Sequence, residues 1–257
     1  MKPPFATTPL SLDAGWAECD VTDQASLAAA VESTVARHGR IDAVVANAGI
    51  ANLGTVSMSD VEALVRTIDV NLNGVVRTVA ATLPHVRAAR GYYLLVSSAA
   101  AFTGLPGMAA YCAAKAGVEQ FGTVLRLELD RAGVAVGTAH PGWIDTDLVR
   151  DISDDLPSFR TALRKLPWPL RSTLPVGVCA ERLVRAIERR QRRVYVPRAI
   201  AGVQAMRTVF NSGLTDAALR RFGGDPVAQL EHEVARLGRS FGRSSMGSTM
   251  ERQRDQS

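Results

Sequence analysis

The stretch that decides the fold reads YYLLVSS at residues 92–98, followed by YCAAK at residues 111–115. The first run is apolar, is bounded by Gly91 and a pair of serines, and is typical of a buried strand. A loop with glycines and a proline separates it from an Ala-rich segment without helix breakers, which predicts a helix. A strand followed by a covering helix is the unit from which α/β folds are built.

Tyr111 and Lys115 are four residues apart, so they lie on one face of the predicted helix, one turn from each other. A free phenol has a pKa of about 10, too high for a good base at neutral pH. A neighbouring ammonium favours the phenolate, so we expect Lys115 to lower the pKa of Tyr111. Ser98, at the end of the strand, could orient a substrate oxygen against the phenol. The alternative is a surface lysine beside a half-buried tyrosine.

On both sides of this stretch in the sequence, apolar runs alternate with helical segments. We predict strands at 16–21, 41–46, 92–97, 134–140 and 193–196. We predict helices at 22–38, from a cap at Ser57 or Ser59 through Asn71 and past Pro84, and at 111–131, 176–190 and 227–237. Apolar strands that alternate with helices predict a parallel sheet covered on both faces.

Composition excludes several classes of protein. The 257 residues are enough for one α/β domain, and 47% hydrophobic with 21% charged residues is ordinary for a globular chain. Cys19, Cys112 and Cys179 lack CxxC spacing, which fits a reducing cytoplasm and neither a disulfide framework nor a zinc site. The four histidines are dispersed, so no metal site is predicted. No long apolar run predicts a membrane span or a signal peptide.

The positive charge is unevenly distributed. Residues 1–150 carry 11 basic and 14 acidic side chains, a net charge of −3, whereas residues 151–257 carry 19 and 11, a net charge of +8. The excess is mostly arginine, notably the run RRQRR at 189–193. Nucleic-acid binding is one interpretation. Aromatic residues are only 5% of the chain and no stacking platform accompanies the run, so we favour a solvated helix end and expect no nucleic-acid partner.

Polar or glycine-containing motifs follow the predicted strands at their carboxyl ends, where ligands gather in parallel sheets. In order and spacing, including the thirteen-residue step from Ser98 to Tyr111, these motifs resemble the short-chain dehydrogenases/reductases. The motifs are Asp20-Val21, Asn47-Ala48-Gly49, NLNG at 71–74, Ser98, Tyr111-x-x-x-Lys115 and PGWIDT at 141–146. The resemblance implies a Rossmann-like, doubly wound parallel sheet over residues 16–198. It also implies a homo-oligomeric, cytoplasmic oxidoreductase that uses NAD or NADP to interconvert an alcohol and a ketone or aldehyde.

The resemblance assigns four catalytic roles. Tyr111 would exchange a proton with the substrate oxygen, and Ser98 would hydrogen-bond that oxygen. Lys115 would lower the pKa of Tyr111 and hold the nicotinamide ribose. Asn71, by its side chain or by bending its helix, would hold a water that links Lys115 to solvent, although it could also be an ordinary asparagine inside a helix.

The resemblance also assigns the cofactor contacts. Tyr111 and Lys115 would contribute, together with Asp20 and Val21 at the adenine, Asn47, Ala48 and Gly49 on the adenosine side, and Pro141, Gly142, Ile144 and Thr146 near the carboxamide. Each motif has a structural alternative: Asp20 or Thr22 could cap the following helix, and the glycine motifs could be simple turns. The preference for NAD or NADP cannot be read, because the discriminating residue belongs to a strand that has no counterpart here.

One part of the family pattern is missing. The family begins with a strand, a TGxxxGxG turn, a helix and a second strand, whereas only Gly15 precedes Trp16 here. We therefore expect an N-terminally truncated sheet without its first two strands and without the main anion site of the dinucleotide. We expect a shortened form of a longer reductase, with one edge of 43–46 exposed or filled by 16–21. The alternative is a cofactor-deficient remnant that acts as a non-catalytic interaction protein.

The remaining segments suggest a substrate class and a domain plan. Residues 143–174 mix leucines and aromatics with basic residues, which fits a lid over a small-molecule substrate, a lipophilic alcohol or ketone. Residues 199–238 are expected to form a helical extension that adds subunit contacts, closes the pocket or touches a membrane surface. We expect residues 1–15 to be loosely ordered and 239–257 to be a disordered tail. Binding to a membrane or nucleic acid through the basic C-terminal third is a third interpretation, based on charge alone.

Overall fold

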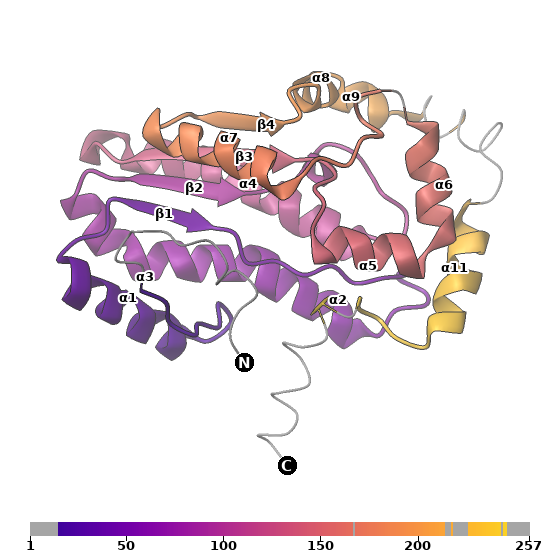
Figure 1. The fold of residues 1–257 in the computed structure, drawn as a ribbon, viewed down its shortest axis with the longest axis horizontal. Coiled ribbons are helices and arrows are strands. Elements are labelled where there is room, and N and C mark those ends of the chain that lie inside the picture. Colours follow the sequence, from indigo (N-terminus) through magenta and orange to yellow (C-terminus); the bar gives the residue numbers. More distant parts are fainter. Residues whose placement is uncertain (1–14, 167, 214–216, 218–225, 243, 246–257) are drawn as a thin grey trace, which may run out of the picture.

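The computed structural model describes residues 15–166, 168–213, 217, 226–242 and 244–245. Within them the chain forms a parallel sheet between layers of helices (Figure 1). The strands are β1 (Ala43–Ala46), β2 (Tyr92–Val96), β3 (Ala135–Pro141) and β4 (Arg193–Val196), in the order β1-β2-β3-β4. Their registers are set by the pairs Ala43↔Tyr92, Tyr92↔Ala135 and Thr138↔Arg193. The predicted α/β class and the parallel sheet are confirmed.

The core lies on both faces of β2, whose five residues are all buried, as expected for a central parallel strand. One face packs Tyr93 and Leu95 against helices α1 (Gln24–His38), α3 (Gly74–Ala88) and α4 (Ala109–Leu129). The other face packs Tyr92 and Leu94 against α7 (Val176–Glu188). Alternate residues of one strand thus fill two separate hydrophobic cores.

Helix α1 shows how local chemistry sets a boundary. Its N-cap is Asp23, whose carboxylate accepts a hydrogen bond from the Ala25 N–H at 2.9 Å, so the helix begins two residues later than predicted. Its end was predicted correctly, because Gly39 adopts φ 75° there and no Cβ opposes that conformation.

The long helix around Asn71 is interrupted. It begins as α2 (Val61–Ile68), passes through the π-helical segment η1 (Asp69–Asn73) and continues as α3, with Pro84 inside. Its N-cap is Asp60, which accepts from the Glu62 N–H, and neither Ser57 nor Ser59 as predicted. A carboxylate at this position also interacts favourably with the helix dipole.

The strand predicted at 16–21 is wrong. Residues 15–20 form no strand, and the Trp16 side chain is 80% exposed. Asp20 instead makes a turn, since its carboxylate accepts from both the N–H and the hydroxyl of Thr22 at 2.8 Å. These local hydrogen bonds hold residues 20–22 in a turn, and the segment does not pair with β1. Among the described residues, β1 is therefore an edge strand, with Val45 41% exposed.

The remaining elements flank α4 or follow β3 and β4. They are a short 3₁₀ turn η2 before α4, another, η3, after it, and the helices that follow β3 and β4. Their bounds are η2 (Ala99–Ala101), η3 (Asp130–Ala132), α5 (Asp147–Asp155), α6 (Pro157–Lys165), α8 (Ile200–Ala205), α9 (Arg207–Phe210) and α11 (Pro226–Leu237). Helix α11 packs beside α6 (Figure 1).

The expectation of a disordered tail from Arg239 is wrong at its start. Arg239 pairs with Asp155 at 2.5 Å, the Ser240 carbonyl accepts from the Leu53 N–H at 2.7 Å, and Phe241 bridges to Asn52. Phe241 is buried, and this apolar burial orders the segment. Residues 246–257 and 1–14 lie outside the described residues, as does part of the predicted extension.

Two absences hold for the described part of the chain. No helix there is long and apolar enough to cross a membrane. No group of three or more His, Cys, Asp or Glu side chains there could hold a metal ion.

Candidate active site

Strand β2 delivers two serines to the carboxyl edge of the sheet. The Ser97 hydroxyl donates to the Lys115 carbonyl at 2.8 Å, which ties the strand end to α4. Ser98 is in an extended conformation and caps η2, where its oxygen accepts from the Ala100 N–H at 3.1 Å. The Ser98 hydroxyl is thereby held where the strand ends.

Helix α4 brings Tyr111 and Lys115 to the same place. Tyr111 hydrogen-bonds Ser98 through its side chain. The Lys115 ammonium is buried, donates to the Val96 carbonyl at 3.0 Å and lies 5.7 Å from the centroid of the Tyr111 ring. The structure therefore brings together the three residues that the sequence pattern singled out.

The expected effect on the pKa of Tyr111 is not found. Burial raises the pKa of the Tyr111 phenol above its usual value, and the hydrogen bond to Ser98 only partly opposes this. Burial also lowers the pKa of Lys115 to about 8. The lysine Nζ is turned to the Val96 carbonyl, so the cost of burying charge dominates at both groups.

Asn71 lies in the π-helical segment and is fully buried. Its amide nitrogen donates to the Ile50 carbonyl at 2.8 Å and to the Thr67 carbonyl at 2.7 Å. Its Oδ1 has no hydrogen-bond partner among the described residues. A Cβ added to Gly49 would lie 2.7 Å from this oxygen and 3.5 Å from the Lys115 Nζ. Gly49, Asn71 and Lys115 therefore border one narrow space. Single π-helical turns inside α-helices, such as the one that carries Asn71, often occur at functional sites.

The PGWIDT motif lies at the carboxyl end of β3. The Gly142 N–H donates to the Val196 carbonyl at 2.7 Å, and Ile144 pairs with Leu174 in a short parallel bridge. The Thr146 hydroxyl points back to the Ile144 carbonyl at 3.4 Å, and α5 begins at the next residue. These residues follow Pro141 at the same edge of the sheet as Ser98.

The residues predicted to meet the adenosine half lie around β1. Asn47, Ala48 and Gly49 follow this strand and are exposed. The Asp20 carboxylate accepts hydrogen bonds from Thr22 in a local turn, and the cap of α1 is Asp23, so neither Asp20 nor Thr22 is the helix cap considered as the alternative. Val21 packs against a small core cluster. Its side chain occupies the space that a side chain on Gly74 would need.

An apolar cavity of about 200 Å³ opens beside Ser98 and Tyr111. Gly142 and the predicted lid line it, through Trp143, Leu148, Val149, Ile152, Leu166 and Leu170. Closing the pocket was one of the three roles expected of residues 199–238, and α8 and α9 supply Ile200, Val203 and Phe210 to the lining. Sequence reasoning missed the loop before α4, which supplies Leu105 and Met108.

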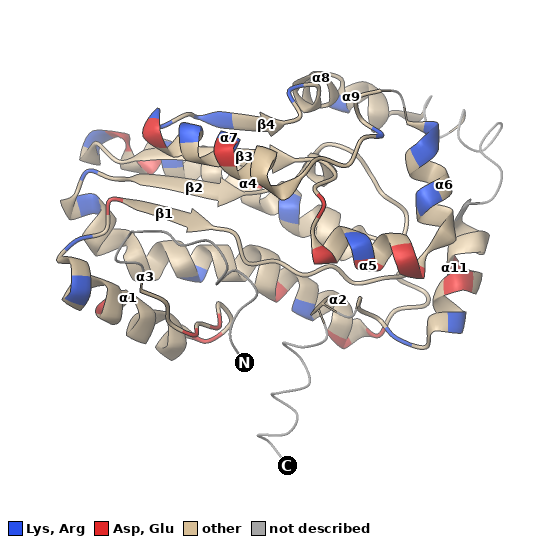
Figure 2. Cartoon of the chain, viewed as in Figure 1, with Lys and Arg blue, Asp and Glu red and all other residues tan. Residues whose placement is uncertain are grey.

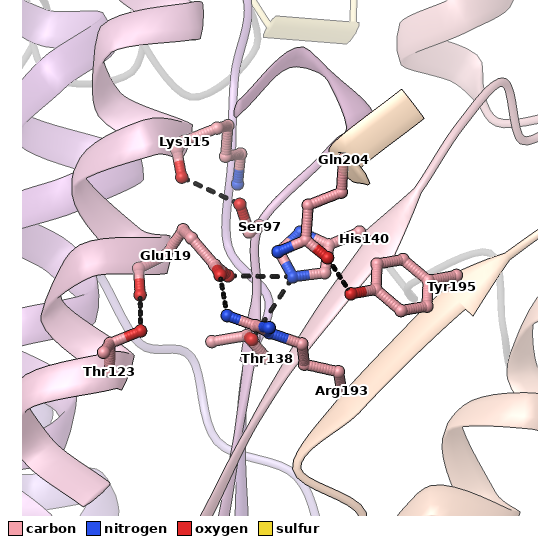
Figure 3. A network of polar contacts seen from close by, with 9 residues as sticks. All are labelled: Ser97, Lys115, Glu119, Thr123, Thr138, His140, Arg193, Tyr195 and Gln204. Atoms are coloured by element: carbon pink, nitrogen blue, oxygen red, sulfur yellow. Dashed lines mark hydrogen bonds and ion pairs between the residues drawn. The ribbon is translucent and has the colours of Figure 1, made fainter. Parts of the chain in front are cut away.

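A buried polar network beneath this site was also missed (Figure 3). Glu119, one turn after Lys115 on α4, contacts His140 Nε2 at 2.8 Å and Arg193 at 3.1 Å. Burial alone would raise the pKa of Glu119, but the hydrogen bond and charge of His140, with Arg193, lower it to about 2. His140 is fully buried between the rings of Phe102 and Tyr195 and immediately precedes Pro141. The network therefore joins α4, β3 and β4 under the site.

Comparison with known proteins identifies relatives. Residues 8–157 match the family model for short chain dehydrogenases. The trans-4-hydroxycyclohexanecarboxylate dehydrogenase of Sinomonas cyclohexanicum is 38% identical over 129 residues, which are 50% of each chain. An uncharacterized oxidoreductase of Myxococcus xanthus is 33% identical over 205 residues, 79% of this chain and 76% of that protein. The chain spans about half the length, or less, of the first curated relatives it matches.

A solved structure shows the same fold. The gluconate 5-dehydrogenase of Burkholderia cenocepacia J2315, in complex with NADP and tartrate, superposes with a TM-score of 0.53 at 29% identity. The superposition covers 57% of both chains.

Proposed function

Because this chain belongs to the short-chain dehydrogenase family, we propose that it is an oxidoreductase that uses NAD or NADP to interconvert an alcohol and a ketone or aldehyde. The observation that carries this proposal is that Ser98 and Tyr111 meet at an apolar cavity, with the Lys115 Nζ 5.7 Å from the centroid of the Tyr111 ring. These groups supply hydrogen bonding, proton transfer and positive charge around one place where a substrate oxygen fits.

Each residue has a defined task in the proposed reaction. When bound, the nicotinamide accepts or supplies the hydride. In the direction of reduction, the Tyr111 hydroxyl gives its proton to the substrate oxygen, and in oxidation the Tyr111 oxygen takes it back. Ser98 hydrogen-bonds the same oxygen and orients it. The substrate loses or gains one hydride and one proton in all.

Lys115 and Asn71 supply the proton route in this proposal. The Lys115 Nζ and the unpaired Asn71 Oδ1 border the same space beside Gly49. A solvent molecule between them would satisfy the asparagine oxygen and return protons to Tyr111 through Lys115. A pKa of about 8 allows Lys115 to release a proton near neutral pH.

The described residues offer more contacts for the nicotinamide half of a dinucleotide than for its pyrophosphate. The missing side chain of Gly49, with the unpaired Asn71 oxygen, leaves room and a polar contact near Lys115. We propose further contacts from the segments that follow β1 and β3: Asp20, Val21, Asn47, Ala48, Pro141, Gly142, Ile144 and Thr146. The glycine-rich turn that would meet the pyrophosphate has no counterpart in the described residues.

The cavity favours a lipophilic substrate. Most of the side chains that line it are apolar, and the hydroxyls of Ser98, Thr103 and Tyr111 supply the polar groups. At about 200 Å³ it suits a small ring or a short chain rather than a polymer. A relative named as a dehydrogenase of a hydroxycyclohexane carboxylate supports this substrate class.

Exposed apolar residues support the proposal of a homo-oligomer. Val61 and Val65 on α2 are 66% and 54% exposed, and Leu127 on the neighbouring α4 is 67% exposed. An apolar surface on two adjacent helices is typical of a subunit interface. The cytoplasmic location stays a prediction.

The open edge of β1 favours the alternative, a non-catalytic interaction protein, because unpaired strand edges bind other chains. Titration with NADH and then NADPH, followed by melting temperature and by the fluorescence of Trp16, Trp143 and Trp168, separates the two. Saturable stabilisation, about 2.7 kcal/mol at 100 times the Kd, supports the oxidoreductase and identifies the preferred cofactor. No response from the folded protein supports the alternative for this chain.

A further inference from the structure

A second cavity, of about 290 Å³, lies at the edge of the sheet opposite to β1, between α7 and β4. Five arginines line it together with Gln191, Val194 and Tyr195: Arg182, Arg185, Arg189, Arg193 and Arg198. Figure 2 shows basic residues on α7, on β4 and on the loop between them. The arginine run at 189–193 was expected to be a solvated helix end, but Arg189 and Arg193 form part of the wall of a cavity.

Few negative charges balance these arginines. Arg185 pairs with Glu181 at 3.0 Å, and Arg193 pairs with Glu119 at 3.1 Å. Within the described part of the chain, no carboxylate and no hydrogen-bond acceptor is paired with Arg189 or Arg198. The cavity therefore keeps a net positive charge, with guanidinium N–H groups free to donate.

Two of the arginines are held in place. Arg182 donates through Nη1 to the Tyr195 carbonyl at 3.2 Å. Arg193 is anchored by the buried Glu119 carboxylate, which His140 contacts from the other side (Figure 3). Each guanidinium carries five N–H donors, so both keep donors after these contacts. Fixed donors bind a ligand with less loss of conformational entropy than free side chains do.

We propose that this cavity binds a small, multiply charged anion of the phosphate class. Planar guanidinium groups match phosphate oxygens with paired hydrogen bonds, and several converge here. The volume suits inorganic phosphate, pyrophosphate or one phosphorylated group. A nucleic-acid strand needs a stacking platform, but Tyr195, the aromatic residue in the lining, has its ring stacked on His140 at 5.4 Å between centroids.

The site is separate from the proposed cofactor site. None of the residues proposed to contact the cofactor lines the arginine cavity. Asn47, Ala48 and Gly49 follow β1, with β2 and β3 between that strand and β4. Pro141, Gly142, Ile144 and Thr146 lie at the end of β3, beside β4, but do not contribute to the lining. The binding of anion here is therefore independent of the NAD or NADP proposal. Cofactor and anion are expected to bind together.

The test is calorimetric titration of the full chain with inorganic pyrophosphate at constant ionic strength, because salt screens exposed charges. The test variant combines Arg189→Gln with Arg198→Gln. The control combines Arg87→Gln with Arg131→Gln, which changes the net charge equally at exposed positions outside the cavity. We expect saturable binding to the native chain, weakened about tenfold or more in the test variant because charge-assisted hydrogen bonds are lost, and unchanged in the control.

Other outcomes overturn the proposal. These are an absence of saturable binding to the native chain, equal weakening in both variants, or displacement of pyrophosphate by saturating NADPH. Tighter binding of a single-stranded oligonucleotide, with the same arginine dependence, would replace it with a nucleic-acid surface. Vesicles containing phosphatidic acid distinguish the two sources of the anion: competition between vesicles and pyrophosphate identifies a lipid headgroup, and its absence identifies a soluble phosphate.

Discussion

At the scale of single residues, Tyr111 is the group on which the proposed chemistry depends most. Tyr111→Phe removes one hydroxyl, and with it the proton donor and the hydrogen bond to Ser98. We expect turnover with an alcohol or ketone substrate to fall by about 10²–10⁴-fold, the usual contribution of a positioned acid or base. Cofactor stabilisation measured by melting temperature should persist. A variant that turns over at the native rate would show that another group moves the proton.

Lys115 gives a second prediction, in alkaline solution. Burial lowers its pKa from 10.5 to about 8 in the folded protein, so the unfolded chain binds more protons between these values. The folded state is therefore destabilised by the buried ammonium below about pH 8, and this cost disappears as the pH rises toward 10.5. Compared with Lys115→Met, the native chain should gain up to about 3 kcal/mol of unfolding free energy across that window. Urea unfolding of both proteins at several pH values measures the difference, and a constant difference would contradict it.

Glu119 gives a third prediction, about the stability of the protein in acidic solution. Its folded pKa of about 2 lies below the usual 4.5, so its stabilising contribution is complete above about pH 4.5 and is lost as the pH falls toward 2. Glu119→Gln should be less stable than the native chain at neutral pH, by about 3 kcal/mol, since it leaves the buried contacts of His140 and Arg193 uncompensated. The two proteins should approach equal stability in acid. Equal stability at neutral pH would instead mean that the network contributes nothing.

At the scale of elements, two glycines give a matched pair. A Cβ on Gly137, in β3, would lie 2.1 Å from the Gln191 carbonyl oxygen and 2.2 Å from the Tyr92 hydroxyl, so Gly137→Ala should destabilise by about 1–3 kcal/mol or more. A Cβ on Gly177, in α7, meets nothing within 4 Å, so Gly177→Ala should stabilise by about 0.5–1 kcal/mol. Thermal unfolding of both variants checks the signs. The same sign in both would contradict the packing described for β3.

The elements also show what sequence reasoning can and cannot reach. The strand at 92–96 and the helix that carries Tyr111 were predicted because local patterns and tertiary packing agree there. The prediction of a strand at 16–21 was wrong because hydrogen bonds from Thr22 to Asp20 form a turn there, and the edge of β1 stays unpaired among the described residues. A bend of the helix at Asn71 was one expectation, but its π-helical form was not predicted, since hydrophobic periodicity cannot detect one inserted residue. Glu119 and His140 were missed because two isolated polar residues give no signal until β3 and α4 meet.

At the scale of the whole molecule, the segment from Arg239 to Phe241 packs against α5 and the loop after β1. Arg239→Gln removes a half-buried pair with Asp155, so we expect a loss of about 2 kcal/mol and faster proteolysis near residues 239–245. Arg236→Gln, an exposed position on α11, is the matched control. Equal cleavage rates in both variants would mean that the pair between Arg239 and Asp155 does not hold the segment in place.

The π-helical turn from Asp69 to Asn73 has a consequence for how this molecule can change. Its Gly74 N–H bonds the Asp69 carbonyl, five residues back, where a regular helix would count four. Losing one residue there would restore an uninterrupted helix from α2 through α3 and swing Asn71 by about 100° away from Ile50 and Lys115. A sequence with the regular helix would have a more stable helix there, but Asn71 would no longer lie beside Lys115. The π-helical turn thus lowers the regularity of the helix but is needed for the position of Asn71.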